Sequence, residues 1–474
     1  MKKETLNLII GILIGIVITT IGFTAYSKFS KDTPQMPNDI QMSGDRREPP
    51  DKPSGDGMKG GPGGDMQGKP NGNMGENVSV NYSAVKEIKS DEEISNTTIS
   101  SETKDENAIL TSGKITVTLA DILADKTGDS DGGDSTSFYG NNSAILAKDG
   151  ANLTIKNATI TTDATGANGV FSYGGSATTN NSSSDGTKIT ISNSTITTKK
   201  DNSGGIMTTG GGTTEANNLT ITTSGTSSAA IRTDRGGGTV TVTGGIYTTK
   251  GQGSPAIYST ADITVNSAKL ISEVSEGIVV EGKNSVTIND CELTDNNVKL
   301  NGQSTTYKNI FLYQSMSQDA ATGTAKFVAK NSNITTNKGD TLYVTNTSAE
   351  IYLENNTITN NDSTANFLRV QKDSWGNTGS NGGEVKLYLT NQNVKGNIVI
   401  DAISKLSMSI KSNSYFEGVI NGENTAEEIN LVLDSTSKIK LTGDCYVTTF
   451  ENEDNTNSNI DFNGYKLYVN GQAI

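Results

Sequence analysis

The sequence has no histidine, few aromatic residues and little apolar material. Without histidine, no Ser-His-Asp or Cys-His catalytic unit can form, and zinc or iron sites built on imidazole are excluded. Apolar residues make up 32% and aromatic residues 5% of the chain, which is below the share typical of a compact globular core. Threonine, serine, asparagine and glycine take their place. This composition is typical of a disordered chain or of a β-solenoid, whose thin core needs little apolar volume per residue.

Basic residues are outnumbered by acidic ones, and the formal net charge is −14. We therefore expect no nucleic acid partner, because binding to a phosphate backbone requires a basic surface. An acidic polysaccharide would need a bridging cation. Only five arginines are present, and two of them, Arg46 and Arg47, precede the part of the chain that we expect to fold.

Residues 1–26 have the pattern of a membrane anchor. Lys2 and Lys3 precede an apolar run from Leu6 to Phe23, which is near the lower length limit for a membrane-spanning helix. No convincing small-residue cleavage site follows the run, so we expect an uncleaved anchor, with a cleaved signal peptide as the alternative. The positive-inside rule then predicts a cytoplasmic N-terminus and a chain that is displayed on the extracellular face of its own cell membrane. A cleaved segment would instead give a secreted protein.

Residues 27–78 have the composition of a disordered linker. Seven of the eight prolines lie here, together with many glycines and methionines and almost no β-branched residues. Such a segment cannot form a core and is expected to be flexible and partly extended. The folded domain is therefore expected at residues 79–474.

An internal repeat determines the expected fold of residues 79–474. Two apolar positions separated by one polar residue recur before a turn, as in “NLTIKNATI”, “KITISNSTI”, “DITVNSAKL” and “SVTINDCEL”. Several copies follow one another after about 21 to 25 residues, and loop insertions are expected near residues 173–187, 300–309 and 371–383. Alternation with a period of two predicts strands, and this repeat predicts an all-β parallel β-helix whose stacked coils share one core.

Asparagine recurs two residues after the second inward residue of the repeat. It tolerates left-handed backbone geometry, and its amide can stack on the next copy, so we predict a ladder of turn asparagines. The members are Asn157, Asn193, Asn331, Asn355 and Asn391. Cys291 and Cys445 would lie several coils apart, beyond disulfide distance, and are interpreted as small buried side chains.

The stretches “RTDRGGGTVTV”, “GSPAIYSTADITV”, “EGKNSVTI” and “NIDFNGYKLYVNGQAI” carry a resemblance to a known superfamily. The coil pattern resembles the right-handed, single-stranded parallel β-helix of the pectin-lyase-like superfamily, and more closely the uncharacterised surface β-helix proteins of anaerobic Gram-positive bacteria. The resemblance covers roughly residues 108–474. It implies the fold but no single function, because the superfamily contains lyases, hydrolases, adhesins and glycan-binding modules.

A second strand of each coil carries a column of bulky side chains, as in “NGVFSYG”, “AAIRTDR”, “PAIYSTA” and “KNIFLYQ”. When alternate residues such as Ile231 and Thr233 point inward, the residues between them point outward. We call this column and its flanking residues the outer stripe. Its members are Phe171, Tyr173, Met207, Arg232, Asp234, Arg235, Tyr258, Glu281, Lys283, Phe311, Tyr313, Tyr343 and Arg369, with Phe367 as the alternative to Arg369.

The outer stripe would place aromatic rings beside charged groups on coils about 4.8 Å apart, an arrangement suited to a long carbohydrate. We therefore predict a solvent-exposed binding surface for polysaccharide or cell-surface glycan on a non-catalytic surface protein or adhesin. Two other interpretations stay open: the inserted loops fold over the stripe and make it a satellite core, or the stripe is an oligomer interface. A structural stalk or surface-layer component is a further alternative for the whole chain.

The alternative function is a calcium-dependent polysaccharide lyase of the pectate-lyase type. The resemblance implies clustered carboxylates that bind calcium and an Arg or Lys base, and the charged members of the outer stripe supply those residue types. Two cations beside Asp234 instead favour an ion-paired turn. Calcium is also a candidate cofactor at the acidic stretch “DKTGDSDGGDS”, where a solvated loop is the simpler interpretation. The carboxylates of that stretch are Asp125, Asp129, Asp131 and Asp134.

Overall fold

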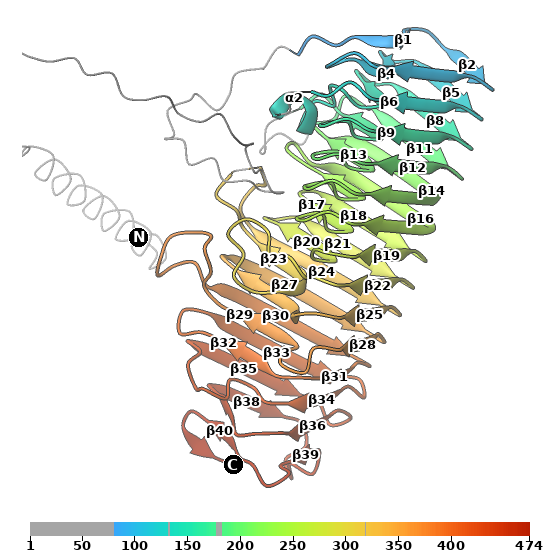
Figure 1. Ribbon diagram of the computed structural model, residues 1–474. Helices are drawn as coiled ribbons and strands as arrows, with labels where there is room; N and C mark the ends of the chain where they lie inside the picture. The colour runs from blue at the N-terminus through green and yellow to red at the C-terminus, as the bar shows by residue number, and fades with distance from the viewer. Residues whose placement is uncertain (1–79, 131–132, 177–182, 318) are drawn as a thin grey trace, which may run out of the picture. The chain divides into compact units, whose positions relative to one another are not determined.

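The computed structural model describes residues 80–474, except 131–132, 177–182 and 318. The regular structure in this part is almost entirely β-strand, and the strands stack in successive coils (Figure 1). The described helix α2 (Asp134–Ser137) is 4 residues long. Within the described ranges, no helix is both long enough and apolar enough to cross a membrane. The predicted anchor and linker, residues 1–26 and 27–78, lie outside the described residues.

The first row of strands forms a 12-stranded parallel sheet. Its members are paired in chain order, so each strand is the copy, one coil later, of the strand beside it. They are β1 (Ala84–Ile88), β4 (Asn107–Ser112), β7 (Ile145–Lys148), β10 (Val170–Tyr173), β13 (Ile206–Thr209), β15 (Ile231–Thr233), β17 (Ile257–Ser259), β20 (Ile278–Glu281), β23 (Lys308–Tyr313), β26 (Asp340–Thr345), β29 (Leu368–Val370) and β32 (Ile398–Ile400).

The second and third rows belong to one 22-stranded sheet, because β14 (Gly212–Thr223) and β16 (Gly238–Thr249) run through both rows. The second row also contains β2 (Glu92–Ser95), β5 (Thr116–Ala120), β8 (Asn152–Lys156), β11 (Lys188–Ser192), β18 (Asp262–Asn266), β21 (Ser285–Asn289), β24 (Thr324–Lys330), β27 (Thr347–Glu354), β30 (Gly383–Thr390), β33 (Lys405–Lys411), β35 (Glu428–Leu433) and β38 (Thr449–Asn452). The third row also contains β3 (Thr98–Ser101), β6 (Leu123–Lys126), β9 (Thr159–Thr162), β12 (Thr195–Thr198), β19 (Lys269–Ser272), β22 (Glu292–Asp295), β25 (Asn333–Thr336) and β28 (Thr357–Asn360).

Two smaller sheets complete the C-terminal coils. The first contains β31 (Asn393–Lys395), β34 (Tyr415–Gly418), β36 (Lys438–Leu441) and β39 (Ile460–Asp461), and the second contains β37 (Cys445–Val447), β40 (Leu467–Val469) and β41 (Gln472–Ala473). The pairing of β40 with β41 is antiparallel, in contrast to the parallel pairing between coils. The expected all-β parallel solenoid with inserted loops is therefore confirmed.

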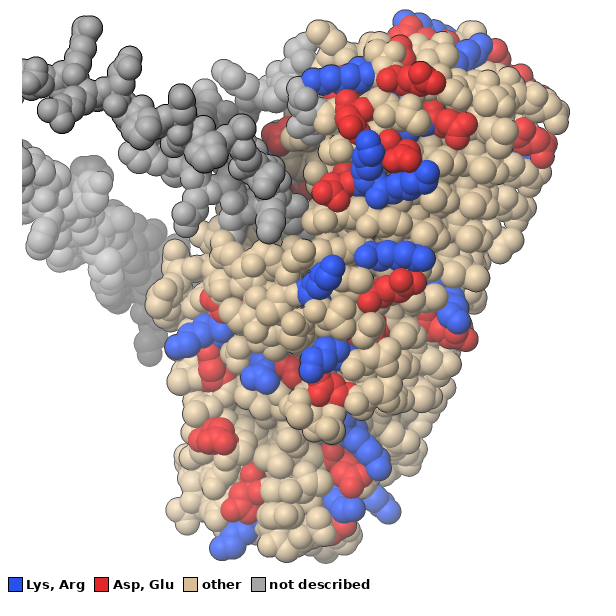
Figure 2. All heavy atoms as spheres, viewed as in Figure 1, with Lys and Arg blue, Asp and Glu red and all other residues tan. Residues whose placement is uncertain are grey.

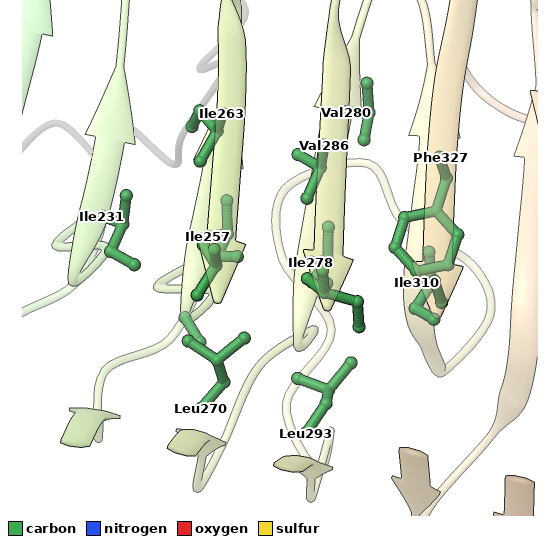
Figure 3. Packing of buried hydrophobic residues seen from close by; sticks show 14 of the residues in the cluster. Ile231, Ile257, Ile263, Leu270, Ile278, Val280, Val286, Leu293, Ile310 and Phe327 are labelled. Carbon is green, nitrogen blue, oxygen red and sulfur yellow. The ribbon is translucent and has the colours of Figure 1, made fainter. Parts of the chain in front are cut away.

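The pairing register stacks similar apolar side chains inside the solenoid. Ile206 pairs with Ile231, and Ile231 pairs with Ile257, so isoleucines repeat along the first row. Figure 3 shows this column meeting apolar side chains from the other two rows, including Ile263, Leu270, Val286, Leu293 and Phe327. Cys291 and Cys445 belong to the same core as buried, unpaired thiols, which confirms their expected role.

The predicted asparagine ladder is confirmed at the bend between the second and third rows. All five predicted asparagines have a positive φ, between 47° and 54°. Their amides also bond from coil to coil: Asn355 Nδ2 donates to Asn331 Oδ1 at 2.9 Å, and Asn391 Nδ2 donates to Asn355 Oδ1 at 3.4 Å. The ladder satisfies polar groups at a position where the left-handed backbone disfavours most other residues.

Charges of both signs are interspersed on the face of the molecule shown in Figure 2. Many of them form ion pairs between neighbouring coils, such as Lys188 with Glu215 at 2.7 Å and Lys330 with Glu354 at 2.9 Å. Exposed pairs of this kind contribute little to stability, typically 0 to about 1 kcal/mol. These pairs matter more for ligand binding, because paired and interspersed charges leave no broad basic patch on this face for a polyanion.

Candidate functional site

The outer stripe follows the side of the first row that faces away from the solenoid core. Strand pairing confirms its central column in the order Leu146, Phe171, Met207, Arg232, Tyr258, Val279, Phe311, Tyr343 and Arg369. Arg369 continues the column, whereas Phe367 packs in the main core. Alternation along the strands therefore predicted correctly which side of the sheet each residue occupies.

The expected solvent exposure of this column is wrong. Phe171 and Tyr343 are 0% exposed, and Arg232 is only 6% exposed. The chain segments between the strands fold over the first row and cover it, which was the alternative interpretation of the stripe. The physical reason is that a column of rings and aliphatic groups is stabilised when it is removed from water, and the longest inserted segments lie beside it.

Two apolar clusters form the cover. Phe138 and Tyr139, from the segment between β6 and β7, pack with the stripe residues Phe171, Tyr173 and Met207. Further along the solenoid, Trp375 packs over the second part of the stripe, from the segment between β29 and β30. Its partners in that cluster are Ala229, Tyr258, Val279, Phe311, Tyr313 and Tyr343.

Trp375 is the single tryptophan of the chain, and its place in the cover was not predicted. Its ring centroid lies 5.2 Å from those of both Phe311 and Tyr313. Asn381 holds the same segment, because its Nδ2 donates to the carbonyl oxygens of Asp373 and Trp375 at 2.7 and 2.9 Å. The available signal was a lone tryptophan inside a Gly-, Ser- and Asn-rich insertion, where a large apolar residue needs a surface to bury against.

Arg232, Asp234 and Arg235 form an ion-paired turn, as the two neighbouring cations suggested; Arg232 and Asp234 are buried, and Arg235 is half-buried. Arg232 Nη2 lies 2.7 Å from Asp234 Oδ2. Burial raises the pKa of Asp234 to about 6, opposed by Arg232 and assisted by the nearby carboxyl of Asp319. Arg235 Nη2 lies 2.7 Å from Asp319 Oδ1, and its guanidinium lies 4.0 Å from the ring centroid of Phe138. The turn thus connects two covering segments to the first row.

The glycines that follow this turn are required by its geometry. Gly236, Gly237 and Gly238 have φ values of 85°, 64° and 147°. A Cβ atom on Gly236 would lie 2.0 Å from the carbonyl oxygen of Ser176. Both the backbone conformation and the close approach of a neighbouring segment therefore exclude a side chain at this position.

Glu281 is fully buried beneath the cover and accepts three hydrogen bonds. The Tyr258 hydroxyl donates to it at 2.5 Å, the Tyr313 hydroxyl donates at 3.0 Å, and the Ser315 hydroxyl donates as well. Burial raises the pKa of Glu281 to about 7 despite these donors. Lys283, two residues later, is exposed, and among the described residues it has no ion pair with Glu281. The stripe carboxylate and the predicted lysine base are therefore not brought together.

A buried cation next to this cluster was missed by the sequence reasoning. Lys308 is 0% exposed, with Nζ 3.8 Å from Glu276 Oε1 and 4.4 Å from the ring centroid of Phe311. Burial lowers the pKa of Lys308. The adjoining cavity, lined in part by Glu276, Tyr258 and Trp375, has a volume of about 20 Å³. That volume is enough for about one water molecule and far too small for a sugar ring.

The described carboxylates of the acidic stretch do not converge. Asp129 lies 3.0 Å from Lys200, and Asp134 lies 3.7 Å from Arg235. Asp125 lies on β6, where it pairs with Thr161 of the next coil, and Asp131 lies outside the described residues. No group of three or more acidic or cysteine side chains suited to a metal ion occurs in the described ranges.

An open groove lies on the second row, formed by β24, β27 and β30. We call it the tyrosine groove; Tyr352 and Tyr388 are half-buried, with ring centroids 4.6 Å apart and ring planes 10° apart. The sequence signal is a tyrosine between two inward residues in “IYLE” and again in “KLYLT”. The groove has a volume of about 250 Å³ and is lined by Lys326, Val328, Lys330, Tyr352, Leu353, Glu354, Tyr388 and Thr390.

The comparisons with known proteins identify no relative of this chain: no family model, curated protein or solved structure matches it. The parallel solenoid therefore rests on strand pairing and on the core described above. Within the described residues, two surfaces place a cluster of aromatic side chains beside charged groups on successive coils. One of these, the outer stripe, is covered, and the other, the tyrosine groove, is open to solvent.

Proposed function

We propose that this chain is a non-catalytic surface protein that binds polysaccharide or cell-surface glycan through its solenoid, as an adhesin or a glycan-binding module. The observation that carries the proposal is the tyrosine groove, which is open to solvent and lined by aromatic and charged side chains. Such a lining suits sugars, because rings contact their C–H faces and charged groups bond to their hydroxyls.

We infer that the solenoid is the right-handed form found in the pectin-lyase-like superfamily. Parallel strands joined by crossovers in one sheet are right-handed in nearly all proteins, which supports this assignment. The N-terminal segment is proposed as the anchor that displays the solenoid on the extracellular face of the cell membrane. Cleavage of that segment would make the protein a secreted one with the same binding function.

The burial of the outer stripe supports binding over cleavage. A catalytic base or acid must come within hydrogen-bond distance of the substrate. Asp234 and Glu281 are buried beneath the cover, and Arg232 is already paired with Asp234. Cleavage at the stripe would require the covering segments to open, whereas binding in the tyrosine groove requires no such change.

The function is tested by incubating the full chain, in mild detergent, with a panel of insoluble and soluble polysaccharides, each with calcium and with a chelator. We expect retention of the protein on at least one polymer and no release of sugar products. Calcium-dependent release of unsaturated oligosaccharides would contradict the proposal and indicate a lyase. Neither retention nor release would also contradict it and would favour a structural stalk or surface-layer component.

A further inference from the structure

We propose that the tyrosine groove binds a neutral glycan chain that lies along the solenoid axis, across β24, β27 and β30. This inference rests on the proposed function and adds the binding site, the class of ligand and the direction in which the ligand lies. It moves the expected binding site from the first row of strands to the second. The residues that carry it are Val328, Tyr352, Tyr388 and Ser409, which stack in register in that order.

The direction follows from this register. Val328 pairs with Tyr352, Tyr352 with Tyr388, and Tyr388 with Ser409, so the groove crosses successive coils rather than following one strand. Coils repeat about every 4.8 Å, a spacing close to the length of one sugar residue in an extended chain. An extended glycan laid along the axis would therefore present about one sugar to each coil.

The stacking surface is the outer face of Tyr388. Its other face is occupied by Tyr352, which is itself followed by Val328 on the far side. Ser409, next in the column after Tyr388, has a side chain too small to cover a ring. Among the described residues, the Tyr388 hydroxyl has no hydrogen-bond partner, whereas the Tyr352 hydroxyl donates to Glu350 at 3.0 Å. Tyr388 thus offers both a ring face and a free hydroxyl to a sugar.

The charges around the groove favour a neutral ligand over an acidic one. Lys330 lies 2.9 Å from Glu354, and Lys386 lies 3.5 Å from Glu350, so these ammonium groups are already paired. Lys326 is placed over the Tyr352 ring, with Nζ 5.2 Å from its centroid. Among the described lysines of the groove, Lys326 alone has no ion pair, so a polyanion would gain little there and would be repelled by the chain as a whole, whose net charge is −14. Paired charges remain able to bond to hydroxyls.

The groove suits a glycan better than a protein partner. A stable protein interface buries roughly 800 Å² on each side and has an apolar centre. The large apolar side chains that are exposed in the described residues lie elsewhere and are scattered: Val85, Leu123, Ile246, Val298, Met316, Tyr465 and Ile474. Besides Val328 and Leu353, the two tyrosines are surrounded by lysine, glutamate and threonine, which offer hydrogen bonds to a ligand rich in hydroxyls.

The test compares Tyr388→Ala with Tyr446→Ala in the full chain, by affinity electrophoresis in gels that contain hydroxyethylcellulose, xylan or alginate. Tyr446 is the matched control, because it stacks on Tyr468 with ring centroids 4.8 Å apart but lies outside the groove. We expect the wild type to be retarded by a neutral polymer. Tyr388→Ala should bind it about tenfold more weakly, which corresponds to about 1.4 kcal/mol, and Tyr446→Ala should bind it unchanged.

Tyr388→Leu is the second variant, since leucine keeps an apolar contact with Tyr352 but has no flat ring; it should weaken binding as Tyr388→Ala does. Full affinity in folded Tyr388→Ala and Tyr388→Leu would overturn the site and leave the proposed function standing. Stronger retardation in alginate than in the neutral polymers would overturn the ligand class. No retardation of the wild type in any polymer would contradict the proposed function itself.

Discussion

Glu281 is a carboxyl group whose surroundings favour its protonated form. Tyr258, Tyr313 and Ser315 donate hydrogen bonds to it, but among the described residues no lysine or arginine pairs with it. Burial raises its pKa from 4.5 to about 7, and the same cause raises the pKa of Asp234 from 3.8 to about 6. Both groups therefore bind a proton more tightly in the folded chain than in the unfolded chain.

This difference predicts a pH dependence with a definite sign. Below pH 4.5, Glu281 is protonated in both states and its contribution to stability is fully present. Between pH 4.5 and about 7 the unfolded chain loses the proton first, so stability falls as the pH rises. The loss for this group is on the order of 3 kcal/mol. Glu281→Gln should flatten the profile in this window, measured by denaturant unfolding from pH 4 to about pH 8.

The test uses the difference between the free energies of unfolding of Glu281→Gln and wild type at each pH, because the other carboxyl groups contribute equally to both profiles. Parallel profiles would show that Glu281 ionises normally in the folded protein. Gln keeps an oxygen that can accept from the surrounding hydroxyls, so the variant is expected to fold. The stability maximum of the wild type is accordingly expected on the acidic side of neutrality.

At the scale of elements, the covering segments and the coils are held in place by different interactions. A coil is held by pairing with the coils on both sides, whereas the segment between β29 and β30 is held by the packing of Trp375 and by individual hydrogen bonds, such as the one that the Tyr343 hydroxyl donates to Asp373 at 2.5 Å. Asn381 braces this segment from within, because its Nδ2 donates to the carbonyl oxygens of Asp373 and Trp375. Segments that lie outside the ladder of paired strands open more readily than the body of a fold.

Asn381→Ala removes both internal hydrogen bonds and is expected to loosen this segment enough to expose Trp375. Because Trp375 is the single tryptophan and is 7% exposed, the wild type should show blue-shifted emission that is protected from acrylamide quenching. The variant should show red-shifted emission and at least twofold stronger quenching, while its far-ultraviolet circular dichroism stays the same. Asn377→Ala, an exposed position in the same segment, is the control and should leave the emission unchanged. Equal emission from both variants would show that Asn381 does not hold the cover.

Sequence reasoning succeeded for the elements that repeat. Ile231 and Thr233 lie inward and Arg232 lies outward because alternation along a strand fixes the side of the sheet. Asn355 was predictable because a left-handed turn with a repeating amide leaves a visible pattern at each coil. These features depend on local backbone geometry that recurs in every copy of the repeat.

The cover could not be predicted in the same way. Periodicity assigns Phe311 to the outer side of a strand but contains no information on what packs over it. The partner of Phe311, Trp375, comes from a segment that occurs once and follows no pattern. Lys308 was missed for a related reason, since a lysine becomes a buried cation only when aromatic rings and Glu276 surround it. Tyr352 and Tyr388 did leave a signal, but it becomes visible only when the second row is aligned coil by coil.

At the scale of the whole molecule, the solenoid is a stack in which each coil contacts its neighbours. Ile278 illustrates this, since it lies between Ile257 and Ile310 in the first row and is 0% exposed. Stability in such a stack is approximately the sum of coil and interface contributions. A defect in the middle is therefore expected to act mainly on the coils beside it and less on the distant ends.

Ile278→Ala tests this directly, with Ile246→Ala as the matched control because Ile246 is 45% exposed. The buried substitution leaves a cavity and should cost about 2 to 5 kcal/mol, whereas the exposed one should change stability by less than about 0.5 kcal/mol. Hydrogen exchange measured by mass spectrometry should show faster exchange in β17, β20 and β23 of Ile278→Ala, with β5 and β33 close to wild type. A uniform loss of protection from the first coil to the last would instead show that the solenoid unfolds as one cooperative unit. In that case Tyr352 and Tyr388 of the tyrosine groove, which lie two and three coils beyond Ile278, would lose their stacked arrangement together with the damaged coils, whereas local unfolding would leave these two rings in place.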